Sequence, residues 1–461
     1  MKLNFLGDKN FFKHVFSVML PILIQNVITN FVSLLDNIMV GQIGTEEMVG
    51  VAIVNQLIFI FNLCIFGGLS GAGIFTAQYH GNNDHDGVRY SFRIKLFIAI
   101  GSFVVFSALF IFFGDNLITA FLYEGEDSID IEKALIFAKE YMSVMLWQLF
   151  PFAIANLYAT TLRETGKTVP PMAASVSAVV INLLLNYILI FGKLGFPVMG
   201  VKGAALATVI SRFAEMLIVI IWTHKNSKSC KFIVSAYKSL KVPKVLVFQV
   251  CKMGLPLLAN EVLWASGMTM LNRYYSVRGV EVVGAINISS TASNLFFCAF
   301  LAMGTTVSII IGQLLGAGEK ERAVDETNKL IIFSIILCAG VGVIMAILSP
   351  YIPNLYNATD LVKSIAVKML LINAAMMPVN AFINVCYFTL RSGGKTLITF
   401  IFDSAFVWVV SIPAALCIAS FTDIPIIPMY IIVQALDFIK CILGYVLIKK
   451  KVWVNNLVRK N

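Results

Sequence analysis

Ionisable side chains are rare inside the apolar runs of this sequence, and two acidic residues are notable there. Asp36 lies in the first run, about five residues before its end, with no Lys or Arg close to it in sequence. Glu261 lies about fourteen residues, or ~21 Å of helix, into a run that begins near residue 247. Inside a membrane such a charge costs about 2.5–3.5 kcal/mol at the centre of a helix, so a charge retained there is a candidate for function. Asp36 and Glu261 are therefore candidate site residues.

Two amide side chains could join Asp36. Asn182 and Asn186 are four residues apart, so they share one face of a helix, and we expect them at a depth similar to that of Asp36. A carboxylate with two amide oxygens is a suitable shell for Na⁺, whereas a desolvated carboxylate alone would hold a proton. We therefore predict an ion site, with Na⁺ as its candidate metal, at Asp36, Asn182 and Asn186. Hydrogen bonding between helices is the alternative role of the two asparagines.

The second candidate group surrounds Glu261. With the adjacent Asn260 and with Asp36, Glu261 is predicted to contact a cationic substrate. Glu261 could instead bind an ion or form a buried pair with another residue. The alternative for Asp36 is that its side chain reaches headgroup water.

Other charged residues in the apolar runs occur in pairs of opposite charge, at spacings that allow the two members of a pair to neutralise each other. Arg212 and Glu215 are three residues apart, as are Asp437 and Lys440. This spacing places two side chains together on a helix and favours ion pairs. Asp403 is expected near the inner end of its run, where it could reach the membrane surface.

The sequence lacks the motifs of an enzyme. Gly-Lys-Thr occurs at 166–168 and at 394–396, but a phosphate-binding loop needs a glycine five positions earlier, where Thr161 and Thr389 stand. The eight cysteines are scattered without a Cys-x-x-Cys pair, and no close cluster of catalytic His, Cys or Asp is present. We predict that the protein is not an enzyme, has no catalytic residues or cofactor, and uses an ion gradient rather than ATP.

The elements that position these residues are predicted to be membrane-spanning helices. The chain is 59% hydrophobic and only 13% charged, whereas soluble domains carry about 25% charged residues. A backbone in hydrocarbon must satisfy its own hydrogen bonds, which favours helices of about 20 residues. We predict an all-α polytopic membrane protein with twelve spans: 14–40, 50–78, 94–114, 134–160, 169–191, 199–223, 247–272, 281–312, 327–349, 364–390, 396–420 and 425–448.

Basic residues indicate the orientation of these spans. The two ends of the chain and the even-to-odd loops hold 25 Lys and Arg, whereas the opposite loops hold 8 and the loop between spans 3 and 4 is acidic. The positive-inside rule then places both termini in the cytoplasm, with the protein in the cell inner membrane. We interpret the net charge of +10 as topogenic charge facing lipid headgroups, and we predict membrane lipids but no nucleic acid as partners.

The sequence also contains an internal repeat, which divides it into an N-terminal lobe (1–224), a basic cytoplasmic linker (225–246) and a C-terminal lobe with the tail (247–461). Six spans in each lobe give both lobes the same orientation, related by an axis along the membrane normal. Transporters of this plan bind their substrate near the midplane between the halves and alternate access by rocking. The paired segments are 19–21 with 254–256, 78–81 with 313–316, and 161–168 with 389–396.

These segments are similar to those of the multidrug and toxic compound extrusion (MATE) family. The resemblance implies a V-shaped bundle of two six-helix lobes that acts as a monomer and exports drug-like, often cationic compounds in exchange for Na⁺ or H⁺. It also implies that Asp36 binds the coupling ion, while an aspartate found in some members at the position of Asn186 is absent here. The similar segments are 20–21, 35–41 (Leu-Asp-Asn-Ile-Met-Val-Gly), 78–81, 200–208 (Gly-Val-Lys-Gly-Ala-Ala-Leu-Ala-Thr) and 390–396.

A lipid-linked oligosaccharide flippase of the same superfamily is the alternative. Such a protein would need several basic residues in its cavity to hold a pyrophosphate. Acidic and amide groups predominate at mid-depth in this sequence, which favours cationic cargo. The sequence leaves open the identity of the substrate and the choice between Na⁺ and H⁺.

Overall fold

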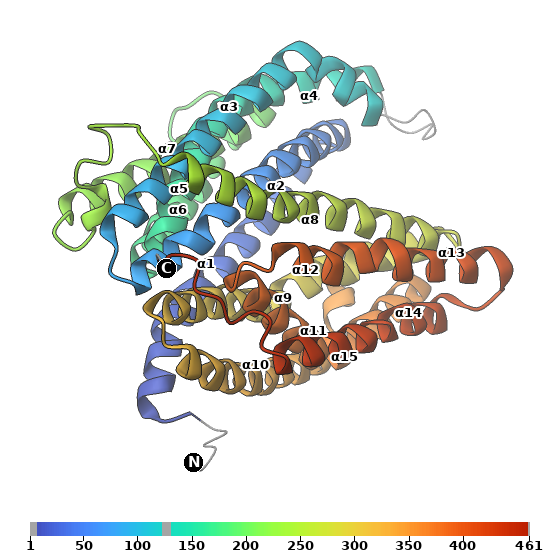
Figure 1. The fold of residues 1–461 in the computed structure, drawn as a ribbon. Helices are drawn as coiled ribbons and strands as arrows, with labels where there is room; N and C mark the ends of the chain where they lie inside the picture. Colours follow the sequence, from blue (N-terminus) through green and yellow to red (C-terminus); the bar gives the residue numbers. More distant parts are fainter. Residues whose placement is uncertain (1–6, 122–130, 460–461) are drawn as a thin grey trace. The chain divides into compact units, whose positions relative to one another are not determined.

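Long helices account for all regular structure in the part of the chain described here. A computed structural model describes residues 7–121 and 131–459, and every regular element within these ranges is helical (Figure 1). Twelve of its helical segments are long and apolar enough to cross a membrane. The predicted all-α polytopic fold with twelve spans is therefore confirmed. The loop between spans 3 and 4, predicted to be acidic and external, lies outside the described residues at 122–130.

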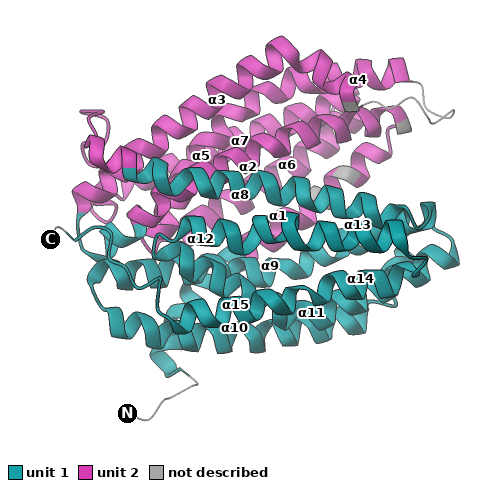
Figure 2. Ribbon diagram, turned by 45° about the vertical axis from the view of Figure 1, so that its right-hand side comes forward, with its two compact units in different colours: residues 1–23, 77–84, 249–461 teal, residues 24–76, 85–248 magenta. Residues whose placement is uncertain are grey.

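The chain forms two compact units, which Figure 2 colours separately. The N-terminal unit comprises residues 24–76 and 85–248, and the C-terminal unit comprises 1–23, 77–84 and 249–461. The first turns of α1 and the last turn of α2 thus group with the C-terminal half. The predicted lobe boundaries at the basic linker rest on the sequence repeat and stay a prediction.

Most of the first nine helical elements belong to the N-terminal unit. They are α1 (Lys9–Gly41), α2 (Thr45–Gly81), α3 (His85–Phe121), α4 (Ile131–Met145), η1 (Leu146–Gln148), α5 (Leu149–Glu164), α6 (Val169–Phe191), α7 (Gly200–Lys225) and η2 (Lys231–Ile233). The remaining elements belong mostly to the C-terminal unit. They are α8 (Lys244–Ser276), α9 (Val280–Ala317), α10 (Lys320–Leu348), η3 (Ile352–Leu355), α11 (Asp360–Ser392), α12 (Thr396–Phe400), η4 (Ile401–Ala405), η5 (Val407–Ser411), α13 (Ile412–Phe421), α14 (Ile426–Ala435) and α15 (Asp437–Lys449).

Two spans contain irregular helical turns. The fourth span changes from α4 through the 3₁₀ turn η1 into α5, immediately before Pro151. Proline has no N–H to donate to the carbonyl of Trp147, four residues earlier, and the tighter turn lies at this gap. The eleventh span contains two π-helical turns, η4 and η5. Such turns redirect side chains and are frequent at functional sites.

The repeated Gly-Lys-Thr motifs end helices. Gly166 and Gly394 have positive φ angles of 77° and 74°, which glycine adopts without steric cost. Beyond them, the N–H of Lys167 donates to the carbonyl of Leu162, and the N–H of Lys395 donates to that of Leu390. This is the hydrogen-bond pattern of a Schellman cap. The two motifs therefore stop α5 and α11 in the same way.

The repeated Gln-x-x-Gly motifs pack against each other. A Cβ at Gly81 would lie 1.9 Å from the carbonyl oxygen of Gln313, and a Cβ at Gly316 would lie 1.9 Å from that of Gln78. Only glycine permits the ends of α2 and α9 to approach so closely. Because each copy presents its glycine to the other, the contact is reciprocal, as in a two-fold related pair.

The tail after α15 packs against other elements of the C-terminal unit. The Trp453 side chain is fully buried, and the N–H of Leu457 donates to the Gln78 side-chain oxygen at 2.7 Å. The Asn456 amide donates to the carbonyl of Leu315 at 2.8 Å. The same amide donates to the carbonyl of Gly316 at 3.0 Å, which satisfies one of the carbonyls that the end of α9 would leave without a partner.

Candidate functional site

Close packing of α6 and α7 positions the predicted amides of the N-terminal unit. A Cβ at Gly203 would lie 2.7 Å from the carbonyl oxygen of Leu189, and Ala204 and Ala207 are buried beside it. Small residues allow membrane helices to approach to this distance. They bring Thr208 of α7 against Asn182 of α6, whose amide donates to the Thr208 hydroxyl at 3.3 Å.

Asp36, Asn182 and Asn186 meet in the N-terminal unit. The Asn186 amide nitrogen donates to the Asp36 carboxylate at 2.6 Å. The Asn182 amide lies 2.9 and 3.1 Å from the two carboxylate oxygens. Both asparagines are buried and Asp36 is partly buried. The structure thus brings together the three residues that were predicted as an ion site, and their role in ion binding stays a prediction.

The orientation of the Asn182 amide determines what this cluster can hold. With its nitrogen towards Asp36, it donates a second hydrogen bond to the carboxylate. With its oxygen towards Asp36 instead, the Asn182 amide accepts a hydrogen bond from the Asn186 amide at 3.3 Å. The Asn182 oxygen and the two carboxylate oxygens of Asp36 then converge. Convergent oxygens need a shared cation or proton. The Asn186 side-chain oxygen is buried and has no hydrogen-bond partner among the described residues, so it is a further oxygen for a cation.

A second group of polar side chains in the same unit forms a hydrogen-bonded chain. Arg212 of α7 pairs with Glu215 at 2.8 Å, which confirms the predicted ion pair. Ser175 of α6 donates to the same carboxylate and accepts from the Gln25 amide of α1 at 2.6 Å. Arg163 of α5 donates to the Gln25 side-chain oxygen at 2.6 Å. Four helices therefore contribute to one hydrogen-bonded chain.

The C-terminal unit contains a second polar cluster, with Asn260 at its centre. The Asn260 amide nitrogen donates to Asp403 at 3.0 Å and to the Tyr387 hydroxyl at 3.3 Å. Its oxygen accepts from the Ser404 hydroxyl at 2.7 Å and from the Ser404 N–H at 3.3 Å. Asp403 and Ser404 belong to the π-helical turn η4. Both ends of the Asn260 amide are thus engaged by protein groups, and its predicted contact with substrate stays a prediction.

Lys440 of α15 lies between two carboxylates. Its ammonium nitrogen is 3.4 Å from Asp437, which confirms the predicted pair, and 3.7 Å from Asp403. Asp403 was expected near the inner end of its span with possible access to the membrane surface. In the structure the π turn directs Asp403 towards α8 and α15, where it bonds to protein partners, and its access to the membrane surface stays a prediction.

Glu261 is partly buried beside this cluster. It makes no hydrogen bond to the residues that the structure describes, and the charges that act on it are those of Arg391 and Asp403. Two nitrogens of the Arg391 guanidinium are buried without hydrogen-bond partners in the described chain, while its centre lies 5.2 Å from the Phe388 ring. The substrate contact predicted for Glu261 stays a prediction.

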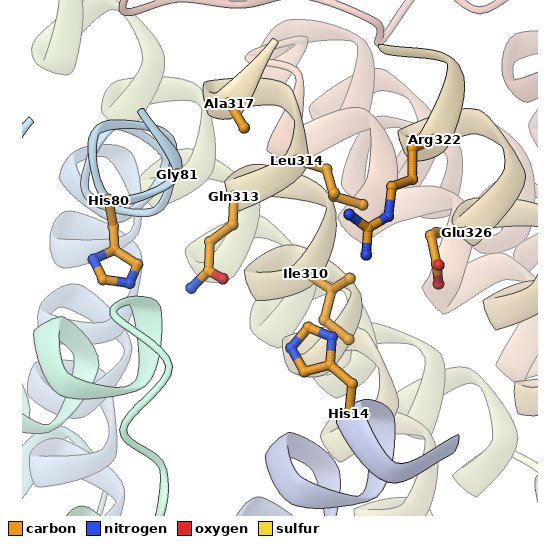
Figure 3. A pocket seen from close by; sticks show the side chains of 9 residues that line it. All are labelled: His14, His80, Gly81, Ile310, Gln313, Leu314, Ala317, Arg322 and Glu326. Carbon is orange, nitrogen blue, oxygen red and sulfur yellow. The ribbon is translucent and has the colours of Figure 1, made fainter. Parts of the chain in front are cut away.

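The C-terminal unit also contains a cavity of about 270 Å³ at the ends of four helices, lined by both polar and apolar residues (Figure 3). His14 of α1 and Arg322 and Glu326 of α10 lie on one part of its wall, and His80 of α2 and Gln313 of α9 lie on another. None of the predicted site residues lines this cavity.

Sequence reasoning did not identify several members of these clusters. Gln25, Ser175 and Tyr387 are neutral side chains in apolar runs, and only the fold shows which residues they face. Arg163 and Arg391 did carry a signal, because they occupy matching positions of the repeated Thr-Leu-Arg segment. In the structure Arg391 is buried and Arg163 is partly buried, at the ends of α11 and α5.

The twelve apolar helices of the described chain, with charged side chains clustered among them, are those of a multi-pass membrane protein, and the comparison with known families identifies it as a transporter. A family model described as MatE matches residues 21–188 and 256–417, and the chain belongs to this family. The two matched segments fall in the two predicted lobes.

Similar proteins support this assignment. The chain is 25% identical to a probable multidrug resistance protein NorM of Thermotoga maritima over 425 residues, covering 91% of this chain and 88% of that protein. It is 23% identical to a probable multidrug resistance protein YoeA of Bacillus subtilis, covering 90% and 88%. A solved outward-facing multidrug resistance MATE family transporter of the MOP superfamily has the same fold, with a TM-score of 0.85, 19% identity, and coverage of 97% and 96%. The predictions of a compound-exporting transporter and of a protein that is not an enzyme are confirmed.

Proposed function

We propose that this protein is a secondary active transporter that exports small organic, often cationic compounds in exchange for Na⁺ or H⁺. The observation that carries the proposal is the Asp36 carboxylate, held by the amides of Asn182 and Asn186 inside the N-terminal unit. A carboxylate retained within membrane helices has a functional role more often than a structural one. The protein works in the cell inner membrane as a monomer, with both termini in the cytoplasm and without ATP or a cofactor.

The coupling ion binds at Asp36. As Na⁺, it is coordinated by the Asp36 carboxylate and by the side-chain oxygens of Asn182 and Asn186. The unpartnered oxygen of Asn186 supports this arrangement, because a buried acceptor without a donor is costly unless a cation occupies it. As H⁺, the ion protonates Asp36, which then donates to Asn182. Hard oxygen ligands suit both ions.

The cargo site includes Glu261, together with Asn260 and Asp36. The Glu261 carboxylate makes no hydrogen bond within the described chain, which leaves its oxygens available to a cationic ligand. Ion binding and cargo binding favour different conformations, so a gradient of one drives movement of the other by alternating access. An ion can shift this equilibrium only by its difference in affinity for the two states.

The lipid-linked oligosaccharide flippase is not favoured as an alternative. The relatives described above are probable multidrug resistance proteins.

Efflux from proteoliposomes tests the proposal. Purified protein is reconstituted, loaded with ethidium, and exposed separately to an inward Na⁺ gradient and to an inward H⁺ gradient at matched membrane potential. We expect at least one gradient to accelerate efflux above that of protein-free liposomes, and ATP to have no effect. If neither gradient accelerates the efflux of ethidium or of other organic cations, ion-coupled cation export is refuted.

A further inference from the structure

The charged groups of the N-terminal unit differ in their partners. Lys95 is completely buried and forms an ion pair with Glu164. Arg212 and Glu215 form a second pair, with 31% and 14% of their side-chain surface exposed. Asp36 has no such direct pair, since the hydrogen bonds described for it come from amides. Among the described residues, Asp36 is therefore a carboxylate that is stabilised without a contacting cation.

At the other end of the polar chain, Arg163 is a cation without a contacting carboxylate. Its described hydrogen bond goes to the neutral side-chain oxygen of Gln25, and its Nε is buried and unpartnered among the described residues. Two carboxylate charges act on Arg163 without a contact in the described chain. One is that of Glu215, across Gln25 and Ser175, and the other is that of the adjacent Glu164, which is itself paired with Lys95. An excess negative charge at Asp36 is thus matched by an excess positive charge at Arg163.

Arg212 lies between these two ends. Thr208, Arg212 and Glu215 follow one another at spacings of four and three residues, so they share one face of α7. Arg212 lies one helical turn, or ~5.4 Å, along α7 from Thr208, which contacts Asn182 of the ion site. The Arg212 charge acts on Asp36 from this position. One flexible guanidinium is therefore near two carboxylates.

We propose that Arg212 is a tethered competitor of the coupling ion, which exchanges its side chain between Glu215 and Asp36 during transport. The inference rests on the proposed function, because it assigns to Arg212 the role of replacing the ion at Asp36. Arg212 is a positioning residue in this scheme. It sets the affinity of the ion site and does not itself bind cargo.

Two arrangements of these charged groups leave each carboxylate next to a positive charge. With the ion on Asp36, Arg212 pairs with Glu215, as in the structure. When the ion leaves, Arg212 pairs with Asp36, and Glu215 is compensated by Arg163 through rearrangement of Gln25 and Ser175. A buried carboxylate without a partner is strongly unfavourable, so states with only half of this exchange are suppressed. Ion release is thereby linked to a change in contacts among α1, α5, α6 and α7.

Removing the competitor should strengthen ion binding. We measure the Na⁺ concentration for half-maximal ethidium efflux, and the Na⁺ dependence of tryptophan fluorescence in detergent, for the wild type and Arg212→Gln. The half-saturating Na⁺ concentration should fall by about 5- to 150-fold, the range of typical coupling energies between sites, and maximal efflux should slow because Na⁺ release is impaired. If H⁺ is the coupling ion, the same comparison is made with external pH. An unchanged or higher half-saturating ion concentration would overturn the proposal.

Two further variants separate this role from a structural one. In the charge-swapped double variant Arg212→Glu with Glu215→Arg, the ion pair is retained but the cation is moved away from Asp36. A purely structural pair predicts wild-type ion dependence for this variant, whereas we expect altered ion affinity and loss of coupled efflux. Ser175→Ala changes no charge but disconnects Glu215 from Gln25. We expect it to shift the half-saturating ion concentration in the same direction as Arg212→Gln, and wild-type values in both tests would disprove the exchange.

Arg278→Gln is the matched control. Arg278 is a partly buried arginine of the C-terminal unit that donates to the backbone carbonyls of Ile418 and Thr422. Its replacement should leave the ion dependence unchanged. If the wild type shows no gradient-driven efflux at all, the proposed function fails. If the wild type is coupled and Arg212→Gln retains its ion dependence, only the competitor role fails.

Discussion

The Asp36 carboxylate is stabilised by dipoles rather than by a contacting cation. Amide hydrogen bonds from Asn186 and Asn182 can hold the charged form, but the amides can also rotate and present oxygen instead. A permanent salt bridge would compete with the ion at every stage of transport, whereas the Arg212–Asp36 pair proposed above forms only after the ion has left. Two amides therefore suit a carboxylate that must accept and release a small cation repeatedly.

Asp36→Asn should separate folding from coupling. The substitution removes a partly buried charge at nearly constant volume, and the new amide can still bond to Asn182 and Asn186, so the protein should remain folded and inserted. Gradient-driven efflux in proteoliposomes should be lost, while ethidium binding in detergent stays measurable. Asn182→Ala and Asn186→Ala should mainly raise the ion concentration needed for half-maximal efflux. Wild-type transport by Asp36→Asn, with the same Na⁺ and pH dependence, would show that the coupling site lies elsewhere.

Glu261→Gln tests the charge preference of the cargo site. A charge-assisted contact with a cationic ligand contributes about 1–3 kcal/mol, so the variant should bind ethidium more weakly by that amount. Fluorescence titration of the purified protein measures this affinity. Glu281→Gln, which removes an exposed acid at the start of α9, should have no effect. Equal ethidium affinity of Glu261→Gln and the wild type would remove Glu261 from the cargo site.

The spacing of residues along a helix and the energetic cost of a charge in the membrane predicted part of the candidate ion site. Asn182 and Asn186 were paired by their spacing of four, and Asp36 was selected because a charge in an apolar run requires a reason. The contact between Asp36 and Asn186 joins segments 150 residues apart in sequence, so spacing alone could suggest it without fixing it. Gln25 and Ser175 could not be found, since periodicity does not tell which helix face meets which partner.

At the scale of elements, the repeated motifs are explained by helix caps and close glycine contacts rather than by a role in binding or catalysis. Gly166 and Gly394 end α5 and α11 with positive φ angles. Gly81 and Gly316 allow the ends of α2 and α9 to touch. The Gly-Lys-Thr segments, which superficially resemble part of a nucleotide-binding loop, are thus helix stops.

Alanine at the crossing glycines should destabilise the protein. In Gly81→Ala or Gly316→Ala, the added methyl group would lie 1.9 Å from a backbone carbonyl oxygen, so a helix must shift. Overpacking of this kind costs about 1–3 kcal/mol. We expect a lower melting temperature of the detergent-solubilised protein, measured by fluorescence-detected size-exclusion chromatography after heating.

Gly101→Ala and Gly340→Ala provide the comparison for this test. An added Cβ meets no atom within 4 Å at either position, and both residues lie inside helices. Alanine is favoured over glycine within a helix by roughly 0.5–1 kcal/mol. Their melting temperatures should therefore be equal to or above that of the wild type. Similar losses in all four variants would contradict the close-contact explanation.

Hydropathy predicted the spans well but not their internal irregularities. A twenty-residue apolar run has the same composition whether its turns are α, 3₁₀ or π, because these differ only in which carbonyl each N–H meets. Pro151 gave a local signal for the irregular turn in the fourth span. Pro413 is a similar marker just after η5, but it lies ten residues from Asp403, so the contacts of Asp403 with Asn260 and Lys440 could not be expected from it.

At the scale of the whole molecule, the repeat and the distribution of charge are independent sources of information. The two segments that match the MatE family model fall in the two predicted lobes, and the Gln-x-x-Gly copies contact each other reciprocally. Neither observation gives the direction of the chain across the membrane. Orientation rests on the bias of 25 to 8 basic residues between the two sides.

Cysteine labelling tests this orientation. In a variant whose eight native cysteines are replaced, single cysteines are introduced at Lys231 or Lys238 in the linker and at Asp423 between α13 and α14, all three of which are exposed. Lys and Arg near span ends are retained on the cytoplasmic side during insertion, whereas Asp423 lies in a loop predicted to be external. A membrane-impermeant maleimide applied to intact cells should therefore label Asp423→Cys alone, and all three should react after the cells are opened. Labelling of Lys231→Cys or Lys238→Cys from outside would show that the predicted topology is inverted and that Asp36 lies nearer the cytoplasmic solution. The ion gradient would then reach Asp36 from the wrong side for export by exchange.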